Sequence, residues 1–289
     1  MFIDNSYVIS LIKENTLFNT SEITCIKKAG GLSNHNFKVS FDDSKKLFIR
    51  ICSQTILNTD RQTELDIINS ASKIELTPKP YYFSSKNGDM ILPWIDGILP
   101  SLSDFAHDNF MKNLTNNLKK LHNLKCDKTF SPFENIRIQI DQCKEKKLPL
   151  PSYFNILENK LNSLEDTLNN NKIIGLCHND FNYSNIIISS HNIYFIDFEY
   201  SAMGDVFWDL ATISWFLDTE ERKKLLLHYF GRFKDEDLKR LVNYLFVVKF
   251  SNALWSLLKI SDSNNNYDYM KGSYIIFEEL IAVYISNEN

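Results

Sequence analysis

The stretch GLCHNDFNYSNIIIS, residues 175–189, places an imidazole, a carboxylate and carboxamides between two apolar runs. Within it, His178, Asp180 and Asn185 follow the spacing HxDxxxxN. A loop fixed between two buried strands holds its side chains with little freedom, which suits catalysis better than a surface turn does. Taken singly, each of these residues would be a common turn or capping residue, so the prediction of a catalytic loop depends on the whole string.

A second acidic segment follows one hairpin later, where YFIDFEYS contributes Asp197 and Glu199. Because a strand has a period of two, we expect both carboxylates on one face. Asn185 begins one predicted strand and Asp197 ends its partner, so the hairpin should bring them together. Carboxylate and amide oxygens suit Mg²⁺, which takes its other ligands from water and phosphates. We therefore predict metal ligation by Asn185, Asp197 and Glu199.

These groups suit phosphoryl transfer, which needs mainly positioning and neutralisation of charge. Beside the metal, Asp180 would accept the proton of an alcohol and aim that alcohol at phosphorus. We expect His178 to brace the catalytic loop by hydrogen bonds rather than to act as a base. Cys177 lies in an apolar run, so we expect a buried thiol rather than a nucleophile.

Phosphoryl transfer also requires a segment that holds the phosphates. In KAGGLSNHNFKV, Gly30 and Gly31 allow a tight turn, and Ser33, Asn34 and nearby amides can donate to phosphate oxygens. A Gly-Gly pair alone more often marks a plain hairpin. The assignment therefore depends on a cation nearby.

That cation is predicted to be Arg50, which stands among apolar residues in LFIRI. A buried charge requires an acidic partner, and Glu64 on the following predicted helix is the candidate. Arg61, one helical turn before Glu64, is the rival to Arg50 as the partner of Glu64, and we expect Arg61 at the surface.

The elements that position these residues change character near residue 100. Before it, strand-like segments with turn signals surround one helical segment; the strands are expected at 23–30, 34–41, 46–52, 80–84 and 89–97, and the helix at 60–72. After it, helical spacing dominates, for example in 225–230 and 235–248, around an island of strand-like segments at 172–178, 185–189 and 192–199. We predict an α+β fold with an antiparallel-sheet lobe, residues 1–92, and a mainly helical lobe, residues 93–289. A cleft between such lobes is the expected ligand site.

Composition excludes several classes. The 289 residues are 44% hydrophobic and 24% charged, with a net charge of −4 and no Lys/Arg cluster, so a nucleic-acid partner is not expected. Five cysteines without CxxC spacing indicate neither a disulfide framework nor a zinc site, and favour a cytoplasmic location. The N-terminus lacks the pattern of a signal peptide. The apolar run from Tyr244 is interrupted by Lys249 and is predicted to be a buried helix, not a membrane span.

The order GGLSN, FIRI, DRQTE, HNDFNYSN and IDFEYSAMGDVFWDLA resembles the choline/ethanolamine kinase family, in particular its bacterial choline kinases, within the aminoglycoside phosphotransferase-like superfamily. The resemblance implies a bilobal protein-kinase-like fold that uses ATP and Mg²⁺. By motif match, Asp180 is similar to the catalytic base, Asn185 and Asp197 to the metal ligands, and Arg50 with Glu64 to the ion pair that holds phosphates.

The segment MILPWIDG resembles the hinge of such kinases, where the backbone near Leu92 and Trp94 would meet adenine. Pro93 has no amide hydrogen and cannot be the donor there.

The acceptor depends on the second half of the chain. A quaternary ammonium is held by aromatic faces, and the segments EYS and LWSLL resemble parts that line the choline pocket of similar kinases; the ring candidates are Tyr200, Trp208, Trp215, Trp255 and Tyr269. Trp208 is also a candidate for the core, and Asp209 for a brace of the catalytic loop. Relatives often carry a glutamate where this chain has Phe216, with Asp218 two residues later.

These observations predict an ATP-dependent choline kinase that makes phosphocholine. Ethanolamine, thiamine or an aminoglycoside remain alternative acceptors, although an aminoglycoside calls for several carboxylates and few rings. A catalytically silent, kinase-like binding module is the alternative from another class. The expected partners are a small-molecule substrate and a nucleotide, without membrane or nucleic acid; the sequence leaves the oligomeric state open.

Overall fold

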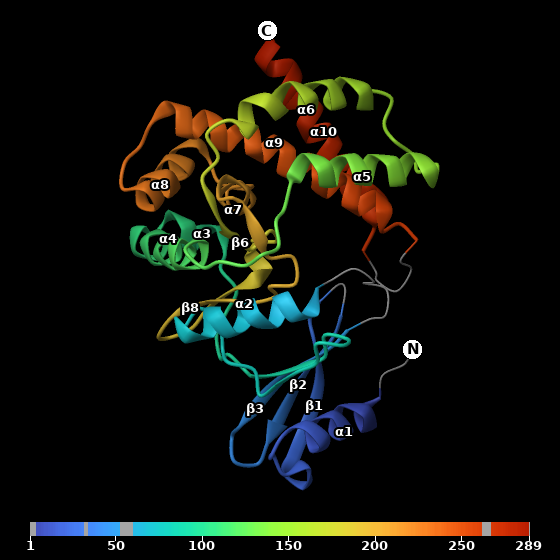
Figure 1. Cartoon of the computed structure of the whole chain (residues 1–289), viewed down its shortest axis with the longest axis vertical. Coiled ribbons are helices and arrows are strands. Elements are labelled where there is room, and N and C mark those ends of the chain that lie inside the picture. Colours follow the sequence, from blue (N-terminus) through green and yellow to red (C-terminus); the bar gives the residue numbers. More distant parts are fainter. Residues whose placement is uncertain (1–3, 32–33, 53–59, 262–266, 289) are drawn as a thin grey trace. The chain divides into compact units, whose positions relative to one another are not determined.

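The computed structural model describes residues 4–31, 34–52, 60–261 and 267–288 (Figure 1). Two compact units divide the chain: the first is Met1–Ser101, Asn123–Asp127 and Asn182–Ser201, and the second is Leu102–His122, Lys128–Phe181 and Ala202–Asn289. The hairpin after the predicted catalytic loop thus groups with the N-terminal sheet. This division differs from the predicted lobes of residues 1–92 and 93–289, whose boundary stays a prediction.

The first unit is built on an antiparallel sheet of five strands in the order β1-β2-β3-β5-β4. The strands are β1 (Ile23–Ala29), β2 (His35–Phe41), β3 (Lys46–Ile51), β4 (Tyr82–Phe83) and β5 (Met90–Pro93). All five lie within the segments that the sequence predicts, because turn residues separate runs of strand-forming residues.

One face of this sheet packs against helix α1. Phe37, Val39 and Phe41 alternate along β2 and are buried in one apolar cluster with Val8 of helix α1 (Asn5–Asn15). The intervening residues of β2 point to the opposite face, since strand side chains alternate. No predicted element covers α1, although Asp4 caps it by accepting hydrogen bonds from two backbone amides.

Helix α2 (Arg61–Lys73) follows β3, and Asp60 caps it through the Thr63 amide. After the short helix η2 (Tyr183–Asn185) comes the hairpin of β7 (Ile186–Ile188) and β8 (Ile193–Phe195). The Phe195 amide donates to the carbonyl of Leu76 at 2.8 Å. The hairpin is therefore joined to the segment after α2 within the first unit.

The second unit is mainly helical, as predicted, which confirms the α+β class. Its helices are α3 (Leu102–Ala106), α4 (Asp108–His122), α5 (Pro132–Glu145), α6 (Phe154–Asn169), α7 (Phe207–Ile213), α8 (Thr219–Phe230), α9 (Asp235–Leu258) and α10 (Tyr269–Glu288). Strand β6 (Ile174–Cys177) lies within a predicted strand segment. It pairs with β9 (Ala202–Asp205), and β9 is not among the predicted strands. A four-residue strand that contains a glycine gives little periodic signal.

Helix α9 contains the apolar run from Tyr244. By length and composition it could cross a membrane, but 61% of its most apolar window is buried inside the structure. It packs against α10 and α5, as Figure 1 lets the reader follow. This burial agrees with the predicted core helix.

Candidate active site

A cavity of about 440 Å³ lies in the first unit. Many predicted nucleotide and metal residues line it, namely Gly30, Gly31, Arg50, Glu64, Leu92, Trp94, Asn185 and Asp197. Apolar side chains of Phe48, Ile68, Met90 and Ile187 supply further walls. Asn34 is not among the lining residues, and Ser33 lies outside the described residues. One cavity thus brings together groups from the sheet, α2 and the β7–β8 hairpin.

The glycine turn at one side of the cavity is held by β2. Asn36 donates from its side-chain amide to the Gly30 carbonyl at 2.8 Å. Gly31 has φ +143°, and a Cβ there would lie 2.4 Å from the Asn36 amide nitrogen. Only glycine permits both this backbone conformation and this approach.

Arg50 is 2% exposed and projects from β3 toward the cavity. Its Nη1 lies 2.7 Å from Glu64 Oε1 and 3.4 Å from Asp197 Oδ1. Burial is the largest single influence and opposes the guanidinium charge, but Glu64, Cys52 and Asp197 together outweigh it and raise the pKa of Arg50. The predicted pair of Arg50 with Glu64 is present.

The prediction of a surface position for Arg61 is wrong. Arg61 is 7% exposed, and its Nη1 lies 2.6 Å from Glu64 Oε2 and 3.3 Å from Glu199 Oε2. Arg61 and Glu64 are three positions apart in the helix, so both lie on the buried face of α2 with Ile68. Asp197, Arg50, Glu64, Arg61 and Glu199 thus form one row of alternating charges.

Glu199, predicted as a metal ligand, is paired with an arginine in the structure, and its ligation of a metal stays a prediction. Its side chain is 2% exposed, faces Arg61 and is not among the residues that line the cavity. Burial, followed by the charge of Asp197, raises the pKa of Glu199 to about 7. Strand β8 ends at Phe195 and Asp197 has φ +68°, so the strand alternation expected for residues 197 and 199 is also absent.

Asn185 and Asp197 fit a hard cation better. The hairpin brings their backbones together, since the Ile196 amide donates to the Asn185 carbonyl at 3.0 Å. Both residues line the cavity, and the Asp197 side chain is 38% exposed. An amide and a carboxylate supply the oxygen atoms that Mg²⁺ prefers.

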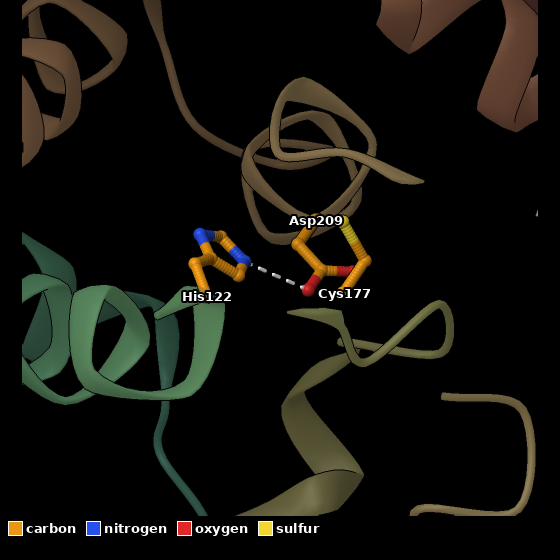
Figure 2. Close-up of side chains that lie close together, drawn as sticks. All are labelled: His122, Cys177 and Asp209. Carbon is orange, nitrogen blue, oxygen red and sulfur yellow. Dashed lines mark hydrogen bonds and ion pairs between the residues drawn. The ribbon is translucent and has the colours of Figure 1, made fainter. Parts of the chain in front are cut away.

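In the second unit, Asp209 of α7 braces the predicted catalytic loop. Its Oδ2 accepts from the His178 amide at 2.6 Å, and its Oδ1 accepts from the Asn179 amide at 2.9 Å. His122 at the end of α4 approaches Oδ2 through Nε2 at 3.1 Å, as Figure 2 shows. Tyr229 lies 2.6 Å from the other His122 nitrogen. The predicted brace is therefore observed.

His122, Cys177 and Asp209 also lie close enough to suggest a metal site, because their potential ligand atoms are within 4.8 Å of one another (Figure 2). The hydrogen bonds of Asp209 to the loop already use both of its oxygens. Burial raises the pKa of the Cys177 thiol, which is fully buried as predicted. These facts assign the cluster to support of the loop.

The rings predicted for the aromatic cage differ in exposure. Trp208 is 5% exposed and donates from its indole to the Asn179 carbonyl at 3.3 Å, which fits the core and brace alternative. Tyr269 is also 5% exposed and packs edge-on against Trp255 at 5.9 Å. The ammonium of Lys249 lies over the Trp215 ring, with its Nζ 5.2 Å from the ring centroid. A cation of the chain itself thus lies beside one predicted ring.

The structure also shows the surroundings of Trp94, predicted at the adenine site, and of Asp218 and Phe216 near the predicted acceptor pocket. The Trp94 amide donates to the Lys46 carbonyl at 3.0 Å, so this amide is used within the sheet and is not a donor for adenine. Asp218 caps α8 by accepting from the Glu221 amide at 2.8 Å. Phe216 is 64% exposed.

The sequence profile of the Choline/ethanolamine kinase family matches residues 25–221, more than half of the chain. The chain belongs to this family. It is therefore a phosphotransferase of the small-alcohol kinase type, as the sequence predicts. The matched span includes the glycine turn, Arg50, the catalytic loop and Asp209.

Individual relatives agree. A LicA homolog from Metamycoplasma hominis is 28% identical over 235 residues, which span 78% of this chain and 86% of that protein. The crystal structure of choline kinase LicA from Streptococcus pneumoniae has a TM-score of 0.81 at 23% identity, covering 96% of this chain and 98% of that one. LicA in complex with AMP has a TM-score of 0.76 at 21% identity and covers 96% and 98%. These likenesses confirm the predicted kinase-like fold.

The kinase motifs fall in both units. Asn185, Asp197 and Tyr200 belong to the first unit, whereas His178 and Asp180 belong to the second. His178 is fully buried and Asp180 is half-buried. The convergence of Asp180 with the metal ligands, and of Tyr200 with the other predicted rings, stays a prediction.

Several supporting residues of this kinase are not among the predicted ones. Arg61 had a signal, its spacing from Glu64 and Ile68 on one helix face. His122 also had one, since it lies four residues after Leu118 on the apolar face of α4. Gly88, which contacts both buried arginines, had none beyond its turn composition.

Proposed function

We propose that the chain is an ATP-dependent kinase that transfers the γ-phosphoryl group to the hydroxyl of choline. The observation that carries the proposal is the cavity of the first unit, whose lining combines Gly30, Gly31, Arg50, Asn185 and Asp197. This combination offers backbone amides, a buried cation and hard oxygen ligands in one space. Family membership restricts the chemistry to phosphoryl transfer.

The cavity suits a nucleotide in shape and chemistry. Phe48, Leu92 and Ile187 offer apolar walls for a purine ring, while Arg50 and the glycine turn offer charge and donors for phosphates. LicA has been solved with AMP, which supports the assignment of an adenine nucleotide here. Because the Trp94 amide is used within the sheet, Leu92 and the backbone that follows Trp94 are the proposed contacts of the base.

Asn185 and Asp197 would hold Mg²⁺, which neutralises phosphate charge when bound. Asp180 accepts the proton of the acceptor hydroxyl and aims its oxygen at the γ-phosphorus. Asp209 and His122 fix the loop that carries Asp180, through the amides of residues 178 and 179. Arg50 holds the phosphates in place while the hydroxyl attacks.

Choline is the proposed acceptor, supported by the structural likeness to choline kinase LicA from Streptococcus pneumoniae and by the ring content of the second unit. Trp215, Trp255 and Tyr200 retain part of their surface, whereas Trp208 and Tyr269 are nearly buried. Tyr269 packs against Trp255, and Trp208 donates to the Asn179 carbonyl, so neither of this buried pair is proposed to face the ammonium. Asp218, engaged as a helix cap, does not replace the glutamate of relatives. A cytoplasmic location and the absence of membrane and nucleic-acid partners stay predictions.

The test is a coupled assay of ADP release with choline, ethanolamine, thiamine and an aminoglycoside as acceptors. We expect the highest kcat/KM for choline. Preference for another alcohol would overturn the acceptor, and no release with any of them would favour a silent binding module.

Asp180→Asn tests the base. We expect a loss of turnover of about a hundredfold or more with unchanged ATP affinity, because the carboxylate acts on the acceptor proton. Asp235→Asn, at an exposed position in the first turn of α9, is the matched control. Full turnover of the Asp180 variant would remove the assigned role.

A further inference from the structure

Gly88 lies in the turn between β4 and β5 and has φ +83°. Its amide donates to the Ser84 carbonyl at 2.8 Å, which closes the turn. Its carbonyl accepts two hydrogen bonds from Arg50, from Nε at 3.2 Å and from Nη2 at 2.9 Å. One backbone oxygen thus holds a whole edge of the Arg50 guanidinium.

The remaining contacts of Arg50 show what this edge contributes. A guanidinium has five N–H donors in a rigid plane. Gly88 accepts from Nε and Nη2, while Nη1 faces Glu64 and Asp197. Because the Gly88 carbonyl is neutral, it fixes the plane of the guanidinium without cancelling its charge. The Gly88 carbonyl thus leaves the charge balance between Arg50 and its two carboxylate partners unchanged at the cavity that Arg50 lines.

Gly88 also lies against the second buried arginine. A Cβ on Gly88 would be 2.5 Å from Arg61 Nε and 2.7 Å from Arg61 Cζ. A side chain there would force the Arg61 guanidinium to move. Arg61 is 7% exposed and bound to Glu64 and Glu199, so movement would break those ion pairs. Glu64 would then lose one of its two cationic partners.

We propose that Gly88 is a positioning residue for phosphoryl transfer. Its carbonyl orients Arg50 toward the phosphates. Because Gly88 has no side chain, it leaves room for Arg61, which forms ion pairs with Glu64 and Glu199. The inference rests on the proposed function, because it assigns Arg50 to the nucleotide. It adds the β4–β5 turn to the parts of the molecule that determine nucleotide affinity.

Gly88→Ala is the test, with Gly231→Ala as the matched control. Gly231 also has positive φ, +70°, but a Cβ there meets nothing within 4 Å. Both variants therefore carry similar backbone strain, and only the Gly88 variant displaces an arginine. The readouts are Mg²⁺-ATP affinity by calorimetry, the KM for ATP, kcat and the melting temperature.

For Gly88→Ala we expect Mg²⁺-ATP binding about tenfold weaker or more, the change that corresponds to roughly 1.4 kcal/mol, and a matching rise in the KM for ATP. Gly231→Ala is expected to bind ATP as the wild type does, with a comparable loss of melting temperature. Equal ATP affinity of the Gly88 variant and the wild type would overturn the inference. Absence of ATP binding by the wild type would instead overturn the proposed function.

A double variant separates the contact with Arg61 from a general folding defect. In the Arg61→Ala background the added methyl group has room, so Gly88→Ala is expected to weaken ATP binding by less than twofold further, or roughly 0.4 kcal/mol. If Gly88→Ala alone does not fold, recovery of folding in the double variant supports the contact. Failure of the double variant to fold, where Arg61→Ala alone does fold, would refute it.

Discussion

Replacing Glu64 by glutamine removes one carboxylate from between two buried arginines. Glu64 lies 2.7 Å from Arg50 and 2.6 Å from Arg61, and the three side chains are 7% exposed or less. Glutamine keeps the size but not the charge. Arg50 then retains Asp197 at 3.4 Å, and Arg61 retains Glu199 at 3.3 Å.

Breaking a buried ion pair by removing one partner costs about 3–5 kcal/mol, because a desolvated charge is left uncompensated. The remaining, longer contacts reduce that cost, so we expect a loss near the lower limit, about 3 kcal/mol. Glu165→Gln is the matched control: Glu165 lies 2.8 Å from Arg137, but the two side chains are 26% and 52% exposed. An exposed pair contributes about 1 kcal/mol or less.

The assay is urea unfolding of the wild type and both variants, followed by far-UV circular dichroism and repeated at high salt. Salt is expected to remove the small effect of Glu165→Gln and to leave most of the effect of Glu64→Gln, because buried pairs are screened less. Equal losses of unfolding free energy in the two variants would refute the reasoning. So would a Glu64 variant as stable as the wild type.

Three further predictions concern the loop brace and the thiols. Asp209→Asn is expected to lower kcat by about a hundredfold, since it weakens the acceptor of two loop amides; unchanged kcat in a Mg²⁺-ATP and choline assay would contradict the brace. Cys177→Ala is expected to keep that activity and its Mg²⁺ dependence, and loss of activity with loss of bound zinc would contradict the assignment of this cluster to support. Burial raises the pKa of Cys52 to about 11. At about pH 8 only roughly one Cys52 thiol in a thousand is ionised, and the thiolate is the form that reacts. The rate of Cys52 alkylation, followed by peptide mass spectrometry, is therefore expected to rise about tenfold per pH unit from about pH 8 to 10. A rate that does not change with pH would contradict the raised pKa.

The sequence by itself determined the local elements and the chemical inventory. Turn residues between runs of strand-forming residues located β1, β2 and β3 to within one residue at each end, because turn chemistry and strand periodicity are properties of neighbouring residues. The string around Asp180 and the buried position of Arg50 were likewise readable, since a charge among apolar residues implies burial with a partner.

Only the tertiary structure decided which groups share a buried environment. The contact of Arg61 with Glu199 joins residues 138 positions apart, and that of Arg50 with Asp197 joins residues 147 apart. No periodicity along the chain encodes such separations. Strand β8 ended before Asp197, which removed the alternation expected for Glu199, and the carboxylate of Glu199 lies beside Arg61. Side-chain spacing reports which face a residue occupies, whereas desolvation and partner charges depend on segments folded against that face, and these fix the role of each ionised group.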